Sequence, residues 1–328
     1  MSDTSKTGIE PLWQDPRAIA LLMAATLSVM ANATISPALA GLAASFSGQP
    51  GSDLLTRMLV PAPSLAVVLL APVVGGIADR FGHARLLVAG IALFAVTGSA
   101  GLYLPDLTWI FASRLMLGVA VAIVMTTQTA LIGAFFEGGR RTTFMGWQIS
   151  ARNFGGLVFI GLAGVLAGYS PRFPFALYAL AGVYVPYVWF AVKGQSVASR
   201  PKDEADAPGA SGKRVWLWPI VMLTALKMLT IMIFFMMPTQ LPFFLASQGG
   251  DHSAKTGLML GILTLSGGMM GFFYLRINRV LREAGSYMLG YALMAGGFLL
   301  LTVDGDLWHS MAMVTIGGGL ATVMPNFI

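Results

Sequence analysis

The stretch VVGGIADRFGHARLLVAG, residues 73–90, lies between two long apolar runs and is unusually rich in charge for this chain. It holds four polar, titratable residues within seven positions: Asp79, Arg80, His83 and Arg85. Only 10% of the 328 residues are charged, whereas soluble domains carry about 25%. The meaning of this short polar stretch therefore depends on what the apolar runs beside it are.

The apolar runs have the length and composition of membrane-spanning helices. Hydrophobic residues make up 56% of the chain, and the mean hydropathy is +0.75. The runs recur near the ~20 residues that cross a bilayer core, and they are continuous rather than alternating, unlike barrel strands. We predict an all-α multi-pass membrane protein with ten spans, at about 18–43, 54–78, 84–104, 107–135, 144–169, 173–193, 215–246, 255–276, 285–303 and 307–328.

The distribution of Lys and Arg predicts the orientation of these spans. With the N-terminus inside, fourteen of the twenty Lys and Arg residues fall in cytoplasmic segments and three in external ones. Cytoplasmic loops carry such an excess, so residues 1–17 are expected to form a cytoplasmic tail. The net charge of +6 then reflects topology. Nucleic acid is not an expected partner, because a DNA-binding protein needs a basic face on one folded domain.

One long polar stretch divides the chain. The segment KGQSVASRPKDEADAPGASGKR cannot build a core, so we expect a cytoplasmic linker over 194–214. Six spans precede it and form an expected N-terminal bundle over 18–193, while four follow over 215–328. A second half of six helices would extend beyond residue 328, so we expect an incomplete C-terminal bundle in a chain truncated after the tenth helix.

A sequence repeat links the two parts. The matching segments are LPDLTWIFASRLMLGVAVA (104–122) and VDGDLWHSMAMVTIGGGLA (303–321). Trp109 pairs with Trp308, and Gly118 pairs with Gly317, at an offset of 199 residues. Parallel repeats of six-helix halves are a known transporter architecture. We therefore predict two pseudo-symmetric helix bundles.

The opening stretch is then a tight cytoplasmic turn between the second and third spans. Gly82 can take the positive φ that such a turn needs. Gly75 and Gly76 are expected to let the second helix end close to a neighbour. Topology alone gives no reason for an acid at this boundary, so Asp79 is the informative residue.

Three motifs carry a resemblance to a known family. The pattern Gly-x-x-Asp-Arg-x-Gly-x-x-Arg resembles the signature loop of the major facilitator superfamily. The segment RLMLGVAVA (114–122) is similar to that family's fourth-helix motif, and SVMANATISPALAGL (28–42) is similar to the first helix of its bacterial drug-exporter branches. In the family the loop's acid helps to latch one of two alternating states. The resemblance thus implies a conformational-switch loop made of Gly76, Asp79, Arg80, Gly82 and Arg85.

The resemblance implies a secondary active transporter of small molecules, a drug or metabolite exporter working by alternating access in the bacterial cytoplasmic (inner) membrane. A monomer embedded in the lipid bilayer is expected, with proton coupling left open. Antiport also stays open, because NFGGLVFIGLAGVLAG (153–168) lacks the proline of the antiporter branches. Two alternatives remain: an organic-anion uptake carrier, or a non-transporting truncated membrane protein.

Enzymatic activity is not expected. The chain has no Gly-Lys-Ser/Thr phosphate loop, and no nucleophile with its base, carboxylate pair or metal cluster is visible in any span. The three histidines lie near different span ends without metal-ligand spacing. No cofactor and no metal are predicted.

Charged residues inside the spans are the first transport candidates. A charge at the bilayer centre costs about 2.5–3.5 kcal/mol on insertion scales. The fourteen Asp and Glu residues are all expected in loops, tails or span ends, and buried cations without buried acids would suit an anionic or amphiphilic substrate. For Arg114 and Arg152, the alternative interpretation is that the side chain extends to the membrane surface. The transport and coupling candidates are Arg114, Gly118, Arg152 and Lys227.

Uncharged polar residues inside the spans are the substrate-cavity candidates. Two of them precede Pro37, which removes a backbone hydrogen bond and can kink the first helix beside a cavity. Each could instead hold helices together, at under ~1–2 kcal/mol per contact. The candidates are Asn32, Thr34, Gln128 and Gln240.

Overall fold

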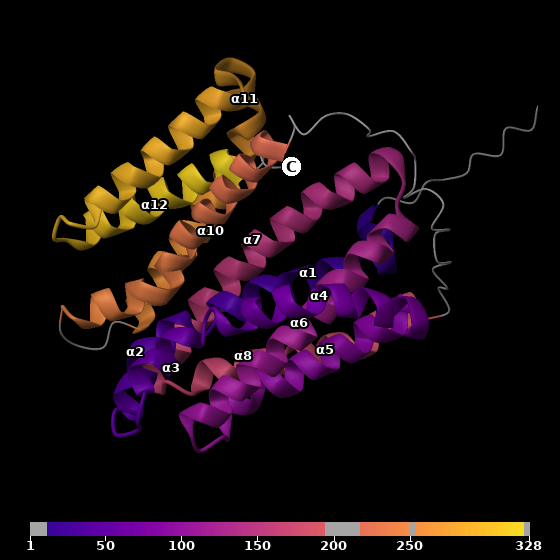
Figure 1. Ribbon diagram of the computed structural model, residues 1–328, viewed down its shortest axis with the longest axis horizontal. Coiled ribbons are helices and arrows are strands. Elements are labelled where there is room, and N and C mark those ends of the chain that lie inside the picture. Colours follow the sequence, from indigo (N-terminus) through magenta and orange to yellow (C-terminus); the bar gives the residue numbers. More distant parts are fainter. Residues whose placement is uncertain (1–11, 194–216, 249–252, 325–328) are drawn as a thin grey trace, which may run out of the picture.

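The computed structural model describes residues 12–193, 217–248 and 253–324, which are almost entirely helical (Figure 1). These ranges contain no strand. The prediction of an all-α fold is confirmed. Most of the expected tail, 1–17, and all of the expected linker, 194–214, lie outside the described residues.

The first group of helices runs from η1 to α9. Its first long helix begins where sequence rules place a start: the Asp15 side chain caps it and Pro16 occupies its first turn. The group comprises η1 (Leu12–Gln14), α1 (Pro16–Ala33), η2 (Ser36–Ala38), α2 (Leu39–Ser45), α3 (Ser52–Met58), α4 (Ala62–Phe81), α5 (His83–Ser99), η3 (Ala100–Leu102), α6 (Leu107–Phe135), α7 (Gly138–Tyr169), η4 (Phe173–Phe175), α8 (Ala176–Ala179) and α9 (Ala181–Val192).

The second group comprises α10 (Leu217–Ala246), α11 (Ser253–Leu300) and α12 (Asp306–Val323). The spans expected at 255–276 and 285–303 are the two arms of α11, which bends by 110° between Ser253–Gly271 and Arg276–Leu300. The polar segment between them forms helix rather than a loop, because it is rich in Arg and Leu and has no proline. Within the second arm, Arg282 has a non-helical backbone conformation, with φ 58°.

Seven helices of the described ranges are long and apolar enough to cross a membrane, or eight if the bent α11 pair is one span. The span expected at 54–78 is divided between α3 and α4, because Pro61 caps the start of α4 and Pro63 occupies its first turn, where a helix tolerates proline. The multi-pass prediction is confirmed.

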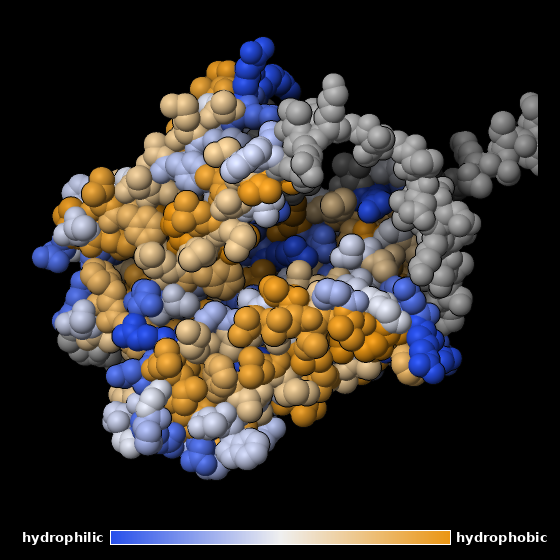
Figure 2. Space-filling model, in the orientation of Figure 1, coloured by the Kyte–Doolittle hydropathy of each residue, from blue (hydrophilic) through white to orange (hydrophobic). Residues whose placement is uncertain are grey.

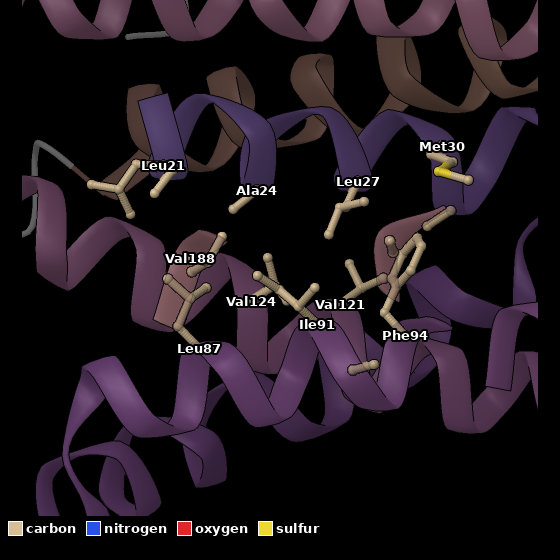
Figure 3. Packing of buried hydrophobic residues seen from close by; sticks show 14 of the residues in the cluster. Leu21, Ala24, Leu27, Met30, Leu87, Ile91, Phe94, Val121, Val124 and Val188 are labelled. Carbon is tan, nitrogen blue, oxygen red and sulfur yellow. The ribbon is translucent and has the colours of Figure 1, made fainter. Parts of the chain in front are cut away.

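The core of the first group lies between α1, α5, α6 and α9. Figure 3 shows Leu27 of α1 facing Ile91 of α5 and Val124 of α6, and all three are buried. Lipid chains are as apolar as these side chains, so close van der Waals packing rather than removal from water holds the helices together.

The two groups meet along α7 and α11 and at one end of the molecule. There α10 packs against η2 and α2, and Ile160 of α7 shares a buried cluster with Leu263 and Ile316 of the second group. We call this the α3 end, and the opposite end, which carries residues 79–85, the loop end. Toward the loop end the second group rises away from the first (Figure 1), and Figure 2 shows a hollow between them with hydrophilic side chains inside it.

The predicted repeat is visible in the helix crossings. Helices α6 and α12 begin at residues 107 and 306, which are 199 apart. A Cβ at Gly118 would collide with the carbonyl oxygen of Pro63, and a Cβ at Gly317 would collide with that of Leu263. The paired glycines therefore make the same kind of close backbone crossing in both groups.

Candidate functional site

Arg114 lies fully buried inside the first group. Its Nη2 donates a hydrogen bond to Tyr178 Oη over 2.7 Å. Its guanidinium also lies 4.5 Å from the centre of the Tyr178 ring and 5.2 Å from that of Phe175. Aromatic faces attract a cation, and the attraction is strongest where water is excluded.

This cation is only partly satisfied. Arg114 Nε and Nη1 are buried without a hydrogen-bond partner in the described part of the chain. No carboxylate of those residues forms an ion pair with it. Because the side chain is fully buried, reach to the membrane surface does not explain it. A buried cation without a counter-ion is costly, so Arg114 is a strong candidate for function.

The α1 candidates flank this cluster. Tyr178 Oη donates to the Ala31 carbonyl over 3.4 Å, and the buried Thr34 hydroxyl, on the next turn, has no hydrogen-bond partner among described residues. Asn32 Oδ1 accepts from Ser64 Oγ over 3.2 Å and so ties α1 to α4. Thr34 is therefore the α1 candidate that stands with Arg114.

Two candidates hold helices together in this structure. Gln128 is buried and donates through Nε2 to the Leu21 carbonyl over 2.6 Å, which joins α6 to α1. Gly118 permits the crossing of α6 over α4 at Pro63. Both contacts match the helix-packing alternative for polar and small residues in spans.

The other two cations stand apart from Arg114. Arg152 lies half-buried on α7, and its Nε is buried without a hydrogen-bond partner among the described residues. Lys227 lies half-buried on α10, one turn before Thr230, whose hydroxyl shares a 2.5 Å hydrogen bond with Tyr291 Oη of α11. The structure thus separates the three predicted cations rather than gathering them at one point.

The α3 end carries a polar contact between the groups that sequence reasoning missed. Arg57 Nη1 of α3 donates to Gln240 Oε1 of α10 over 2.7 Å, and its guanidinium lies 4.3 Å from the Phe243 ring centre. Ser36 Oγ also donates to the Pro238 carbonyl. Gln240, a cavity candidate, thus takes part in a contact between groups. Arg57 had no sequence signal beyond its place in an external loop.

His309 is a second buried group that the sequence did not single out. It is 1% exposed, and neither ring nitrogen has a hydrogen-bond partner in the described ranges. Its ring packs edge-on against Phe244, 5.6 Å between centres. Phe244 in turn lines an apolar pocket with Met236 and Leu301. No feature of the sequence distinguished this histidine from the other two.

The residues predicted to form a conformational-switch loop lie in a tight turn at the loop end. Helix α4 ends at Phe81, and Gly82 adopts φ +88°, as the turn requires. Asp79 is 66% exposed, and its Oδ1 lies 3.6 Å from His83 Nε2. Arg80 and Arg85 are exposed.

One expectation for this loop is wrong. A Cβ at Gly75 or Gly76 would meet no atom within 4 Å. The face of α4 that carries Gly75 and Gly76 therefore approaches no neighbouring helix, and at this end the second group lies away from the first (Figure 1).

A family model described as Major Facilitator Superfamily matches residues 21–328. The chain belongs to the Major Facilitator Superfamily. Two curated members resemble part of it: Multidrug resistance protein 2 of Bacillus subtilis is 26% identical over 117 residues, and Quinolone resistance protein NorA of Staphylococcus aureus is 27% identical over 136. These matches cover 36% and 42% of this chain, and about a third of each relative (29% and 34%).

Solved structures of the superfamily share the fold over most of the chain. The D-xylose-proton symporter superimposes with a TM-score of 0.73 at 14% identity, covering 94% of this chain and 80% of its own. The inward open conformation of the xylose transporter XylE from E. coli gives 0.67 at 14% identity, covering 93% and 79%. At these identities the likeness shows the fold alone.

Proposed function

We propose that this carrier exports small molecules, drugs or metabolites, by alternating access across the bacterial cytoplasmic membrane. The main observation that supports this proposal is that the two helix groups are in contact at the α3 end and apart at the loop end. A hollow open to one side only is what one state of an alternating-access carrier requires. Export is supported by the relatives, which are named for multidrug and quinolone resistance.

The proposed orientation places the loop end in the cytoplasm, together with the N-terminus. The excess of Lys and Arg in the segments at that end supports it. On this orientation the structure is an inward-facing state.

We assign different parts of the cycle to different residues. Arg114 and Tyr178 form the coupling group, because the energy of a buried cation without a carboxylate changes strongly when an anion or water reaches it. Asp79 and its loop stabilise the opposite, outward-facing state, in which the loop end is closed. Arg57 and Gln240 stabilise the state seen here.

Transport by purified protein in liposomes tests the proposal. The chain is reconstituted with an acidic lumen, and uptake of ethidium and norfloxacin into the lumen is followed by fluorescence, with nigericin to collapse the pH gradient. A gradient-dependent flux that Arg114→Gln abolishes is expected, with Arg141→Gln, an exposed change on α7, as the matched control. A wild-type flux no greater than that of empty liposomes would contradict a transport function.

Uptake is the second candidate, because one of the structures that share the fold is a D-xylose-proton symporter. The two directions differ in the sign of the accompanying proton movement. In the same liposomes, substrate added outside alkalinises the lumen if protons leave in exchange. It acidifies the lumen if protons enter with the substrate. The second result would replace export by uptake. We further propose a monomer without enzymatic activity, since carriers of the superfamily move their substrates unchanged.

A further inference from the structure

Two glycines near the end of α5 lie against the aromatic rings that contact Arg114. Gly98 lies in the last turn of α5 and Gly101 in η3, and both are buried. A Cβ at Gly98 would lie 2.6 Å from Tyr178 Cβ and 2.7 Å from its Cγ and Cδ1. A Cβ at Gly101 would overlap three ring atoms of Phe175. Carbon atoms pack about 3.5–4.0 Å apart, so only glycine leaves room for these rings.

These rings hold Arg114 from outside its own helix. Arg114 lies on α6, whereas Phe175 belongs to η4 and Tyr178 to α8. The Arg114 guanidinium lies 5.2 Å and 4.5 Å from the two ring centres, and its Nη2 donates to Tyr178 Oη over 2.7 Å. The Tyr178 ring also packs against Phe94, one turn before Gly98, at 5.7 Å between ring centres. The position of both rings therefore depends on how closely the segment of η4 and α8 approaches α5.

A side chain at Gly98 would displace Tyr178 by more than its hydrogen bond tolerates. To restore an ordinary contact of about 3.5 Å, the base of the ring has to retreat by about 0.9 Å. N–H···O hydrogen bonds form over a range of only about 0.5 Å, from about 2.7 to about 3.2 Å. Arg114 has no second hydrogen bond to compensate, because its Nε and Nη1 are without a partner in the described part of the chain. Gly98 thus determines whether this buried cation keeps its hydrogen bond.

Close helix packing is the ordinary role of glycine in a membrane protein, and α5 offers an example of that role alone. A Cβ at Gly90 would lie 2.6 Å from Ile123 Cγ2 of α6, and the next nearest atoms belong to Ile123 and Val124. Gly90 lies about 12 Å from Gly98 along α5, at 1.5 Å per residue. The two glycines are therefore equally crowded, but only Gly98 is crowded by a ring that contacts Arg114.

We infer that Gly98 and Gly101 are positioning residues for the coupling group. Together they form a slot on α5 that admits the rings of Tyr178 and Phe175 and so holds both rings against Arg114. A methyl group at either position would weaken the coupling group without touching the arginine itself. The inference rests on the proposed role of Arg114 in transport for its purpose, but the placement of the rings is tested without transport.

The test follows the Tyr178 ring directly by fluorine NMR of the purified full chain. All eight tyrosines are labelled with 3-fluorotyrosine, and the Tyr178 resonance is identified by its absence from Tyr178→Phe. Arg114→Leu cannot donate to Tyr178 Oη and so gives the position of this resonance without the hydrogen bond. Gly98→Ala is expected to shift the resonance toward that position. Gly101→Ala, which acts through Phe175, is expected to shift it in the same direction and is the second variant if Gly98→Ala does not fold.

Gly90→Ala is the matched control, because it crowds the same helix to the same distance and should leave the Tyr178 resonance at its wild-type position. In liposomes, Gly98→Ala is expected to transport about tenfold more slowly than Gly90→Ala. A hydrogen bond to a charged group contributes at least as much free energy as a factor of about ten in rate represents.

Three results would overturn the inference. The first is a Tyr178 resonance at its wild-type position in Gly98→Ala, and the second is an equal shift in Gly90→Ala. The third is an equal transport rate for the two variants when the wild type transports. If the resonance shifts as expected and the wild type shows no flux, the export function fails while the placement of the rings by these glycines stands.

Discussion

At the scale of single residues, Arg114 combines a high energetic cost with a central position. Its Nε and Nη1 lack partners among described residues, and its one hydrogen bond within the described ranges goes to the phenol oxygen of Tyr178. Replacing a buried ion pair with apolar residues of similar size is often neutral or stabilising, by about 1–4 kcal/mol, and a buried charge without a counter-ion is more costly still. We therefore expect Arg114→Leu to unfold at the same or a higher temperature than the wild type while losing transport.

Thermal unfolding in detergent, paired with flux in liposomes, checks this prediction. Tyr178→Phe is the useful comparison, because it removes the hydroxyl but keeps the ring, leaves Arg114 less satisfied and should cost about 1–3 kcal/mol. An Arg114→Leu protein that unfolds at a lower temperature than Tyr178→Phe would show that the arginine is structural.

Asp15 gives a prediction about pH. Burial raises the pKa of its carboxyl, but hydrogen bonds from Arg17 and the charges of Arg17 and Arg140 outweigh burial and leave the pKa below its usual value. A carboxyl with a lowered folded-state pKa contributes stability that is complete above the unfolded value, about 3.9, and is lost as the pH falls through the folded-state value.

Asp15→Asn should therefore lower the free energy of unfolding by about 1–2 kcal/mol at pH 7 through loss of the charge that binds Arg17 and Arg140, because asparagine caps a helix as well as aspartate does. The difference from the wild type should shrink as the pH is lowered below about 4. Asp304→Asn, an exposed change, serves as control and should have no effect. A difference that is constant from pH 7 to pH 3 would exclude the charge as its cause.

The sequence could predict which residues were unusual but not what each one touches. Hydropathy alone predicted that Arg114 lies inside a span, and the structure shows that its side chain is fully buried. Tyr178 and Arg57 were missed because their partners lie 64 and 183 residues away, and no local pattern encodes such distances. Gln128 was a cavity candidate because it is polar in an apolar run, yet its amide reaches the Leu21 carbonyl.

At the scale of helices, the Gly118 crossing is open to a direct test. A Cβ on Gly118 would meet the carbonyl of Pro63 and the side chain of Ala66. Gly118→Ala should push α6 away from α4 and cost about 1–3 kcal/mol, as overpacking does. Gly133→Ala, also on α6, meets nothing within 4 Å and should gain about 0.5–1 kcal/mol from helix propensity.

A comparison of the unfolding temperatures of Gly118→Ala and Gly133→Ala tests this prediction. If Gly118→Ala were as stable as Gly133→Ala, the crossing would not depend on the glycine. The different effects of the two substitutions could be predicted only from the structure, because Gly118 and Gly133 lie in the same apolar run. The repeat with Gly317 and the resemblance of residues 114–122 to the fourth-helix motif were the hints that the sequence offered.

Helix lengths were predictable where composition changes sharply, and less so where it does not. The α6 span, expected at 107–135, agrees with the structure because Pro105 and Asp106 precede it and Glu137 follows it. The arms of α11 were expected as separate helices, because charge was taken as a boundary. Arg and Glu are also good helix formers, so the chain continues as helix through the charged segment and bends there instead.

At the scale of the whole molecule, the Arg57 contact links the two groups at the α3 end. Its loss removes one charge-assisted hydrogen bond and one cation–π contact between groups. We expect Arg57→Ala to shift the population by about three- to tenfold toward the state open at the α3 end, since about 1 kcal/mol separates such ratios. The wild type lacks cysteine, so a labelled pair can be introduced cleanly.

Spin labels at Leu54→Cys and Ser247→Cys report the distance between the two groups at the α3 end by double electron–electron resonance. Both positions are exposed. Longer distances should become more populated in Arg57→Ala. Arg172→Ala is the matched control, because Arg172 donates to the Leu104 carbonyl inside the first group. Equal distance distributions in the wild type and Arg57→Ala would exclude Arg57 as a tie between the groups.

The paired crossings at Gly118 and Gly317 bear on the direction of transport. Backbones in direct contact leave little room to slide, so each group is expected to move as a stiff body, and the conformational change is confined to the surface between them. Two rigid groups that rock about a shared contact can open equally well to either side of the membrane. Such an architecture sets no direction of transport by itself. The same molecule would export or import its substrate according to the direction of the solute gradients across the membrane.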